Sequence, residues 1–122
     1  MTEQEFWIFL KQAMERGREP MLASHIDTAD PELQKMGEYI MGHSYLPKDY
    51  DKIGKGVITE MGRLLMDLRV RHKTKEAVMM ILAHNGSDEA LDILRTYNRI
   101  PDKGLEVFSM LALQECRMWN EG

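Results

Sequence analysis

The chain has 122 residues, 43% hydrophobic and 30% charged, which is typical of one globular domain spanning 1–122 and too apolar for a disordered chain. Its formal net charge of −4 argues against nonspecific binding to phosphate backbones, because such binding requires clustered Lys and Arg. Cys116 is the only cysteine, which excludes an intramolecular disulfide and the zinc motifs built on cysteine pairs.

The N-terminal region, 1–42, has the pattern of helices. Thr2 and Glu5 are spaced as a capping box, so we expect a first helix with Phe6 and Leu10 on its buried face. Residues 18–29 contain Pro20 and only a few apolar side chains, and we expect a short helix and turn there. The first helices would therefore be short and separated by a turn.

A further helix is expected to begin at Asp30-Pro31-Glu32, because Asp caps free amides and Pro suits the first helical position. Its expected apolar stripe comprises Leu33, Met36, Gly37 and Ile40. Residues 43–52 then interrupt the helical pattern with Tyr45, Pro47 and Tyr50 among alternating charges, which indicates a loop. This loop is where a specific site, including an enzyme site, would first be sought.

The second half of the chain, residues 53–120, predicts four helices. The first runs from about Ile53 to His72, and its buried face comprises Val57, Ile58, Met61, Leu64, Leu65 and Leu68. Thr74 is expected to cap the next helix, which Asn85-Gly86 ends with a left-handed residue. Ser87-Asp88-Glu89 starts another helix, and a last one spans 103–119 with Leu105, Phe108, Leu111, Ala112, Cys116 and Trp119 on its main face.

A short sequence motif occurs twice within these helices. Glu76-Ala77-Val78, followed by Ile81-Leu82-Ala83, recurs as Glu106-Val107-Phe108, followed by Leu111-Ala112-Leu113, and such a recurrence is typical of solenoid units. The segment 75–116, with its Asn-Gly helix end, Ser-Asp-Glu-Ala-Leu helix start and Pro-Asp break, resembles short HEAT-like repeats. The resemblance implies an all-α fold, a short right-handed helical stack of HEAT-like helix pairs. An antiparallel helical bundle satisfies most of the same motifs.

The resemblance implies binding of other proteins, and we expect a non-enzymatic interaction or scaffold module. The residues expected to contact a protein partner are Arg63, Asp67, Arg71, Asp92, Arg95 and Arg99. Only Asp92 and Arg95 are plausible members of the ladder between layers that HEAT-like repeats carry, which leaves the repeat register open.

The basic run of Arg69, Arg71, His72, Lys73 and Lys75 supports an alternative, binding of nucleic acid or a phosphate ligand. A solvated helix end would carry the same charges without any partner. In the last helix, Met110 and Leu113 lie off the main apolar face, which suggests self-association as a homodimer. A central position in a helical bundle explains those two residues equally well.

The histidines and the cysteine, which often act as catalytic residues or metal ligands, show no pattern of a catalytic or metal site. No two of the four histidines, His25, His43, His72 and His84, have the helical spacing of a metal site, so we expect no metal, cofactor or catalytic residue. Cys116 should be buried and unreactive. The sequence also lacks a secretory signal and an apolar run of about 18 residues, so we expect a cytoplasmic protein away from membranes.

Overall fold

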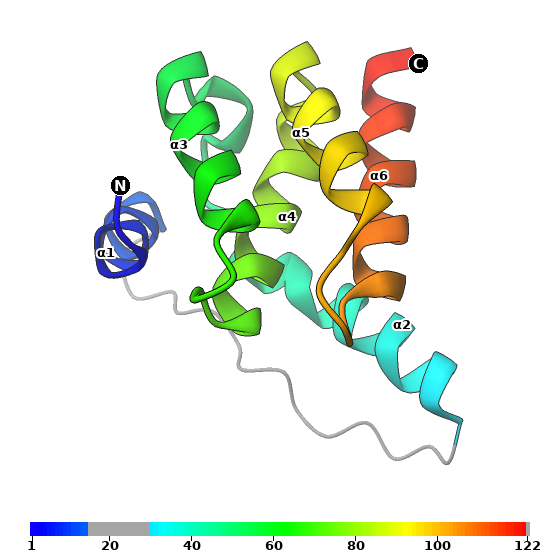
Figure 1. Cartoon of the computed structure of the whole chain (residues 1–122). Helices are drawn as coiled ribbons and strands as arrows, with labels where there is room; N and C mark the ends of the chain where they lie inside the picture. The colour runs from blue at the N-terminus through cyan, green and yellow to red at the C-terminus, as the bar shows by residue number, and fades with distance from the viewer. Residues whose placement is uncertain (15–29, 122) are drawn as a thin grey trace.

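The computed structural model describes residues 1–14 and 30–121, which form six α-helices and two short 3₁₀ helices without a strand (Figure 1). The helices are α1 (Glu3–Ala13), α2 (Pro31–Gly42), η1 (His43–Tyr45), η2 (Tyr50–Lys52), α3 (Lys55–Met66), α4 (His72–Asn85), α5 (Asp88–Arg99) and α6 (Glu106–Glu121). The predicted all-α fold is confirmed. The short helix and turn expected over 18–29 lie outside the described residues. No described helix has both the length and the apolar character needed to cross a bilayer.

The last four helices form two layers. α3 lies beside α5 in one layer, and α4 lies beside α6 in the other. Successive helices run in alternating directions and pack on each other, α3 on α4, α4 on α5 and α5 on α6 (Figure 1). α2 crosses one end of this arrangement and contacts both α4 and α6. The layer of α4 and α6 is therefore covered from two sides.

Local capping explains where several helices begin and end. The Thr2 hydroxyl accepts from the Glu5 amide at 3.1 Å, and the Glu5 carboxylate accepts from the Thr2 amide at 2.8 Å, which completes the predicted capping box. Ser87 caps α5 by accepting from the Ala90 amide at 3.1 Å. Gly86 ends α4 with a φ of 73°, in the left-handed conformation that glycine adopts without strain. These predicted boundaries are confirmed.

The core is one cluster of buried side chains that extends from Phe6 of α1 to Cys116 of α6. α4 lies at its centre, and every residue from Ala77 to His84 is buried. Such burial on all sides is expected where α2, α3, α5 and α6 all contact the same helix. One consequence is that His84, in the last turn of α4, lies inside the molecule.

The predicted apolar stripe of α2 is wrong. Leu33, Met36 and Ile40 are exposed, whereas Tyr39 is buried. The reason is that α2 packs on α6 through its Tyr39 face, where the Tyr39 and Phe108 rings meet edge to face with centroids 4.9 Å apart. Tertiary contact with an aromatic side chain outweighs the local apolar pattern.

The predicted helix from Ile53 to His72 is too long. α3 ends at Met66, because the Asp67 carboxylate accepts from the backbone amide of Arg69 at 2.9 Å and from its guanidinium at 3.1 Å, stabilising a turn. Leu68 is consequently exposed, and Val70 is buried instead. α4 begins at His72, so Thr74 lies within the helix and does not cap it.

The last helix differs from the prediction at two positions. Leu113 is buried, although its place off the main face suggested exposure, because α6 contacts α2, α4 and α5 on different sides. Trp119, expected on the buried face, is exposed near the end of the helix. Met110 remains exposed. Leu113 is therefore part of the core of a single chain and is not available to a second copy.

Candidate metal centre

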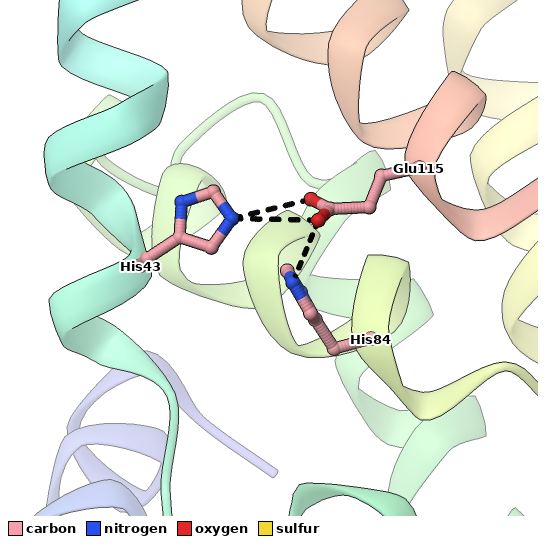
Figure 2. Close-up of side chains that lie close together, drawn as sticks. All are labelled: His43, His84 and Glu115. Atoms are coloured by element: carbon pink, nitrogen blue, oxygen red, sulfur yellow. Dashed lines mark hydrogen bonds and ion pairs between the residues drawn. The ribbon is translucent and has the colours of Figure 1, made fainter. Parts of the chain in front are cut away.

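Three side chains from different elements meet at one point, as Figure 2 shows. His43 is the first residue of η1, His84 lies in the last turn of α4, and Glu115 lies on α6. Nε2 of His84 is 2.9 Å from Oε2 of Glu115, and Nε2 of His43 is 3.3 Å from Oε1. One possible ligand atom from each residue lies within 4.8 Å of the other two.

Close packing at Gly42 holds His43 in this position. A Cβ atom on Gly42 would lie 3.0 Å from Cε of Met80 and 3.2 Å from Cζ of Phe108. Glycine therefore allows the end of α2 to approach α4 and α6 more closely than another residue would. The next residue, His43, is thereby brought against His84, and the two imidazole rings lie 4.9 Å apart.

Hydrogen bonds to the backbone fix the tautomer of both histidines. Nδ1 of His84 lies 2.9 Å from the Met80 carbonyl oxygen, and Nδ1 of His43 lies 3.1 Å from the Ile40 carbonyl oxygen. A carbonyl oxygen only accepts, so Nδ1 carries the hydrogen in both rings. In a neutral ring of this tautomer, Nε2 presents a lone pair. Both Nε2 atoms face the Glu115 carboxylate (Figure 2).

This arrangement brings electron-rich atoms together and requires positive charge between them. Protons on both rings would supply it, as would a cation bound by all three groups. A tetrahedral zinc ion with bonds of about 2.0–2.2 Å places neighbouring ligand atoms roughly 3.4 Å apart. The distances from His43 Nε2 to the two Glu115 oxygens, 3.3 and 3.5 Å, match this spacing. The His84 distance of 2.9 Å is shorter than this spacing and is that of a direct hydrogen bond or ion pair.

Tyr39, on the face of α2 that packs on α6, supports the carboxylate. Its hydroxyl donates to Oε1 of Glu115, and its ring packs edge to face on His43, with centroids 5.3 Å apart. Burial and the Glu115 carboxylate hold the pKa of Tyr39 above its usual value, so the hydroxyl keeps its hydrogen. Hydrogen bonds of this kind orient ligating carboxylates in metal sites. Tyr39 is therefore placed to position Glu115.

Two further aromatic rings flank His84. The Tyr50 ring lies 5.8 Å from it and the Trp119 ring 6.2 Å, measured between centroids. The side-chain amide of Asn85 donates to the Tyr50 carbonyl at 2.8 Å and so holds η2 against the end of α4. The loop 43–52, singled out in the sequence, thus contributes both a histidine and an aromatic neighbour to the centre.

Cys116 follows Glu115 directly but does not join the group. Its thiol is buried and faces the Leu82 carbonyl oxygen at 3.7 Å. Burial raises the pKa of Cys116 to about 11, which keeps the thiol protonated and unreactive near neutral pH. The predicted burial of Cys116 is confirmed.

The residues expected to contact a protein partner divide into three groups. Arg63, Asp67 and Asp92 line an open groove between α3 and α5. Arg95 and Arg99 are exposed on α5, outside the residues that line this groove. Arg71 lies elsewhere, 2.9 Å from the Glu3 carboxylate of α1.

The basic run is not one continuous positive surface. Lys75 is only 1% exposed, and its ammonium lies 2.5 Å from the Asp102 carboxylate. Lys75 lies on a buried side of α4, so its side chain points into the molecule. Arg69 pairs with Asp67 at 3.1 Å and Arg71 with Glu3 at 2.9 Å. These carboxylates offset much of the positive charge that the sequence suggested.

Comparison with family models, curated proteins and solved structures finds no match to this chain. Function is therefore inferred from the geometry of the chain itself, and the geometry singles out residues that sequence reasoning missed. His43, His84 and Glu115 are far apart in sequence, and no spacing rule connects them. The available signal was His84 alone, a polar residue that directly follows the apolar run 77–83.

Proposed function

We propose that this chain binds one divalent transition-metal ion through His43, His84 and Glu115. The supporting observation is the orientation of the histidines, whose Nδ1 atoms face backbone carbonyls while both Nε2 atoms face one carboxylate. In metal-binding histidines the N–H of the second ring nitrogen usually donates in this way, because the hydrogen bond fixes the ring and leaves the other nitrogen free to bind the ion. The centre thus has donors and orienting groups together.

The donor set favours zinc and its close analogues over magnesium or calcium. Two imidazole nitrogens and one carboxylate oxygen suit zinc, cobalt, nickel or ferrous iron, whereas magnesium and calcium take oxygen ligands almost entirely. Among the three donors only Glu115 supplies oxygen. The ion is therefore expected to be of the zinc class.

Titration of the metal-free protein tests this proposal. After dialysis against a chelator, the chain should bind Zn²⁺ with a stoichiometry of one, measured by competition with a chromogenic chelator. His43→Gln and Glu115→Gln should each weaken binding by about 100-fold or more, because loss of a ligand costs at least as much as loss of an orienting group. His72→Gln is the matched control, since His72 is exposed at the opposite end of α4.

Two results would overturn the proposal. One is a wild-type affinity no higher than that of His43→Gln. The other is an equal loss for His72→Gln, which would indicate nonspecific histidine binding. Circular dichroism of each variant checks folding, and His43 is the preferred site of substitution because it is the most exposed of the three donors.

Protein binding at the α3–α5 groove is a second candidate function. The groove is lined by apolar Met66 and Ile93 and by charged side chains that include Arg63, Glu89 and Asp92. Its proposed occupant is an amphipathic helix of a protein partner, with its apolar face against Met66 and Ile93. The pairing of α3 with α4 and of α5 with α6 supports the HEAT-like interpretation, and stacks of that type commonly bind proteins.

A photocrosslinking amino acid placed at Thr96, within the groove, tests this second function in the cells that make the protein. A discrete protein adduct should form from Thr96 and disappear when Met66→Glu is added. Lys48, exposed outside the groove lining, is the control position. Equal adducts from both positions, or an adduct insensitive to Met66→Glu, would remove the groove as the binding surface.

Self-association through α6 is the proposed oligomeric arrangement. It relies on Met110 and Met118, both exposed on α6, because Leu113 is buried within the chain. Light scattering of the wild type against Met110→Glu tests it. A dimeric wild type and a monomeric variant are expected, and equal masses would contradict a dimer through this face.

A further inference from the structure

The exposed fraction of the side chain increases across the three donors of the proposed metal centre, from His84 to Glu115 to His43. The side chain of His84 is 6% exposed, that of Glu115 23% and that of His43 37%. His84 lies on the buried helix α4, whereas His43 lies just beyond α2 on η1. The centre is therefore closed on the α4 side and reached by solvent on the His43 side.

Three neighbouring polar groups within the described chain already have hydrogen-bond partners. The Tyr39 hydroxyl donates to Glu115, and the Asn85 amide donates to the Tyr50 carbonyl. The Cys116 sulfur faces the Leu82 carbonyl oxygen and is buried. His43, His84 and Glu115 thus form a group of three among the His, Cys, Asp and Glu side chains that the structure describes.

Three protein ligands do not complete the shell of a zinc-class ion, which takes four or more ligands. We infer, on the basis of the proposed function, that the ion bound by His43, His84 and Glu115 carries an exchangeable solvent ligand on the His43 side and accepts small anions there. A divalent ion beside the single Glu115 carboxylate retains net positive charge. This charge favours hydroxide and small monoanions over neutral ligands.

Such a site belongs to the reactive class of metal centres. Structural zinc sites have four protein ligands, whereas catalytic sites have three and hold water in the remaining position. A water molecule on the ion would lose a proton to solvent more readily than free water, leaving a bound hydroxide. Exchange with an added anion involves only this ligand and leaves His43, His84 and Glu115 on the ion.

Cobalt substitution provides the test, because the visible spectrum of Co²⁺ reports its coordination. The metal-free chain is loaded with one equivalent of Co²⁺ and titrated with sodium azide, with sodium perchlorate at matched ionic strength as the control. The expected result is a saturable change in the visible spectrum with azide and none with perchlorate. His43→Gln should change the cobalt spectrum, because the ion loses a nitrogen ligand.

Cys116→Ala is the matched variant for the remaining possibility, a thiolate fourth ligand. We expect the same azide response in this variant as in the wild type, without a sulfur-to-cobalt charge-transfer band in either. A wild-type cobalt spectrum that does not respond to azide would overturn the inference while leaving metal binding intact, as would a charge-transfer band lost in Cys116→Ala. Failure of the wild type to bind cobalt would instead overturn the proposed function.

Discussion

The hydroxyl of Tyr39 donates to the same Glu115 carboxylate that faces His43 and His84. This contact links the buried face of α2 to α6 at the candidate metal centre. It also keeps one carboxylate oxygen fixed, so that the carboxylate does not rotate away from the histidines. The role of this hydroxyl can be separated from that of the Tyr39 ring, which packs on Phe108.

Tyr39→Phe should therefore weaken Zn²⁺ binding by about 10- to 100-fold while leaving the fold intact, because the ring is retained and only the orienting hydrogen bond is lost. Competition with a chromogenic chelator measures the affinity. The control is Tyr97→Phe, since Tyr97 is also a buried tyrosine that donates to a carboxylate, that of Asp102. Zinc affinity unchanged in Tyr39→Phe would show that Tyr39 does not position Glu115.

Asp102→Asn should destabilise the chain by about 3–5 kcal/mol, because it leaves the buried Lys75 ammonium without its opposite charge. Burial raises the pKa of Asp102, but the hydrogen bonds from Lys75 and Tyr97 outweigh that effect and lower it. Urea unfolding measures the loss. Adding Lys75→Met should recover part of it, since Met removes the unpaired charge.

Asp92→Asn is the matched control for the buried pair. Asp92 pairs with Arg95 at 3.9 Å on the surface of α5, where the side chain of Asp92 is 76% exposed. Little change in stability is expected there, because exposed ion pairs contribute little. Similar losses for Asp92→Asn and Asp102→Asn would contradict the importance of burial at Lys75.

Glu76 should make stability depend on pH. Burial, and then the nearby Glu38 carboxylate, raise the pKa of Glu76 to about 7. Between pH 4.5, the ordinary pKa of Glu, and about pH 7, the Glu76 carboxyl is therefore protonated in the folded chain and ionised in the unfolded chain. Stability from this group is present at low pH and is lost as the pH rises through that window.

Glu76→Gln should remove this dependence and exceed the wild type in stability by about 1–2 kcal/mol at pH 8, with little difference at pH 4.5. Thermal unfolding in the presence of a chelator, across that range, measures the gap without a contribution from metal. Asp51→Asn, at an exposed position in η2, should show no such trend. A difference in stability between Glu76→Gln and wild type that stays constant with pH would contradict a raised pKa at Glu76.

Gly62→Ala should destabilise the contact between α3 and α5 by about 1–2 kcal/mol. A Cβ atom at Gly62 would lie 2.8 Å from Cδ1 and 3.1 Å from Cγ1 of Ile93, so the whole Ile93 side chain would have to move. Gly56→Ala is the control, because a Cβ there meets nothing within 4 Å. It should be neutral or slightly stabilising, since Ala favours helix. Equal urea midpoints for the two variants would contradict the close contact.

Helix boundaries were predictable where a short local motif sets them. The Thr2–Glu5 capping box, the left-handed Gly86 and the Ser87 cap each involve residues close in sequence, and all three are present. The choice of buried face was less predictable. Tyr39 is buried in place of Ile40 because Phe108, on a distant helix, provides the contact. Local periodicity does not contain that information.

The candidate metal centre could not be predicted from spacing. His43 and His84 belong to different elements, so no helical spacing connects them. Their approach depends on the packing of α2 against α4 and α6 at Gly42, which is set by Met80 and Phe108. The exposure of Arg63 and Asp92 was easier to predict, because the exposed faces of α3 and α5 follow from helical periodicity.

His43 is the first residue after α2, and its two counterparts lie on α4 and α6. A bound ion would therefore link the end of α2 to α4 and α6. Removing it should loosen α2 first, because α2 exposes Leu33, Met36 and Ile40 to solvent and buries Tyr39 as its hydrophobic contact with the core. Metal binding would then determine how firmly α2 is held on α4 and α6. Amide hydrogen exchange along α2 would measure this effect.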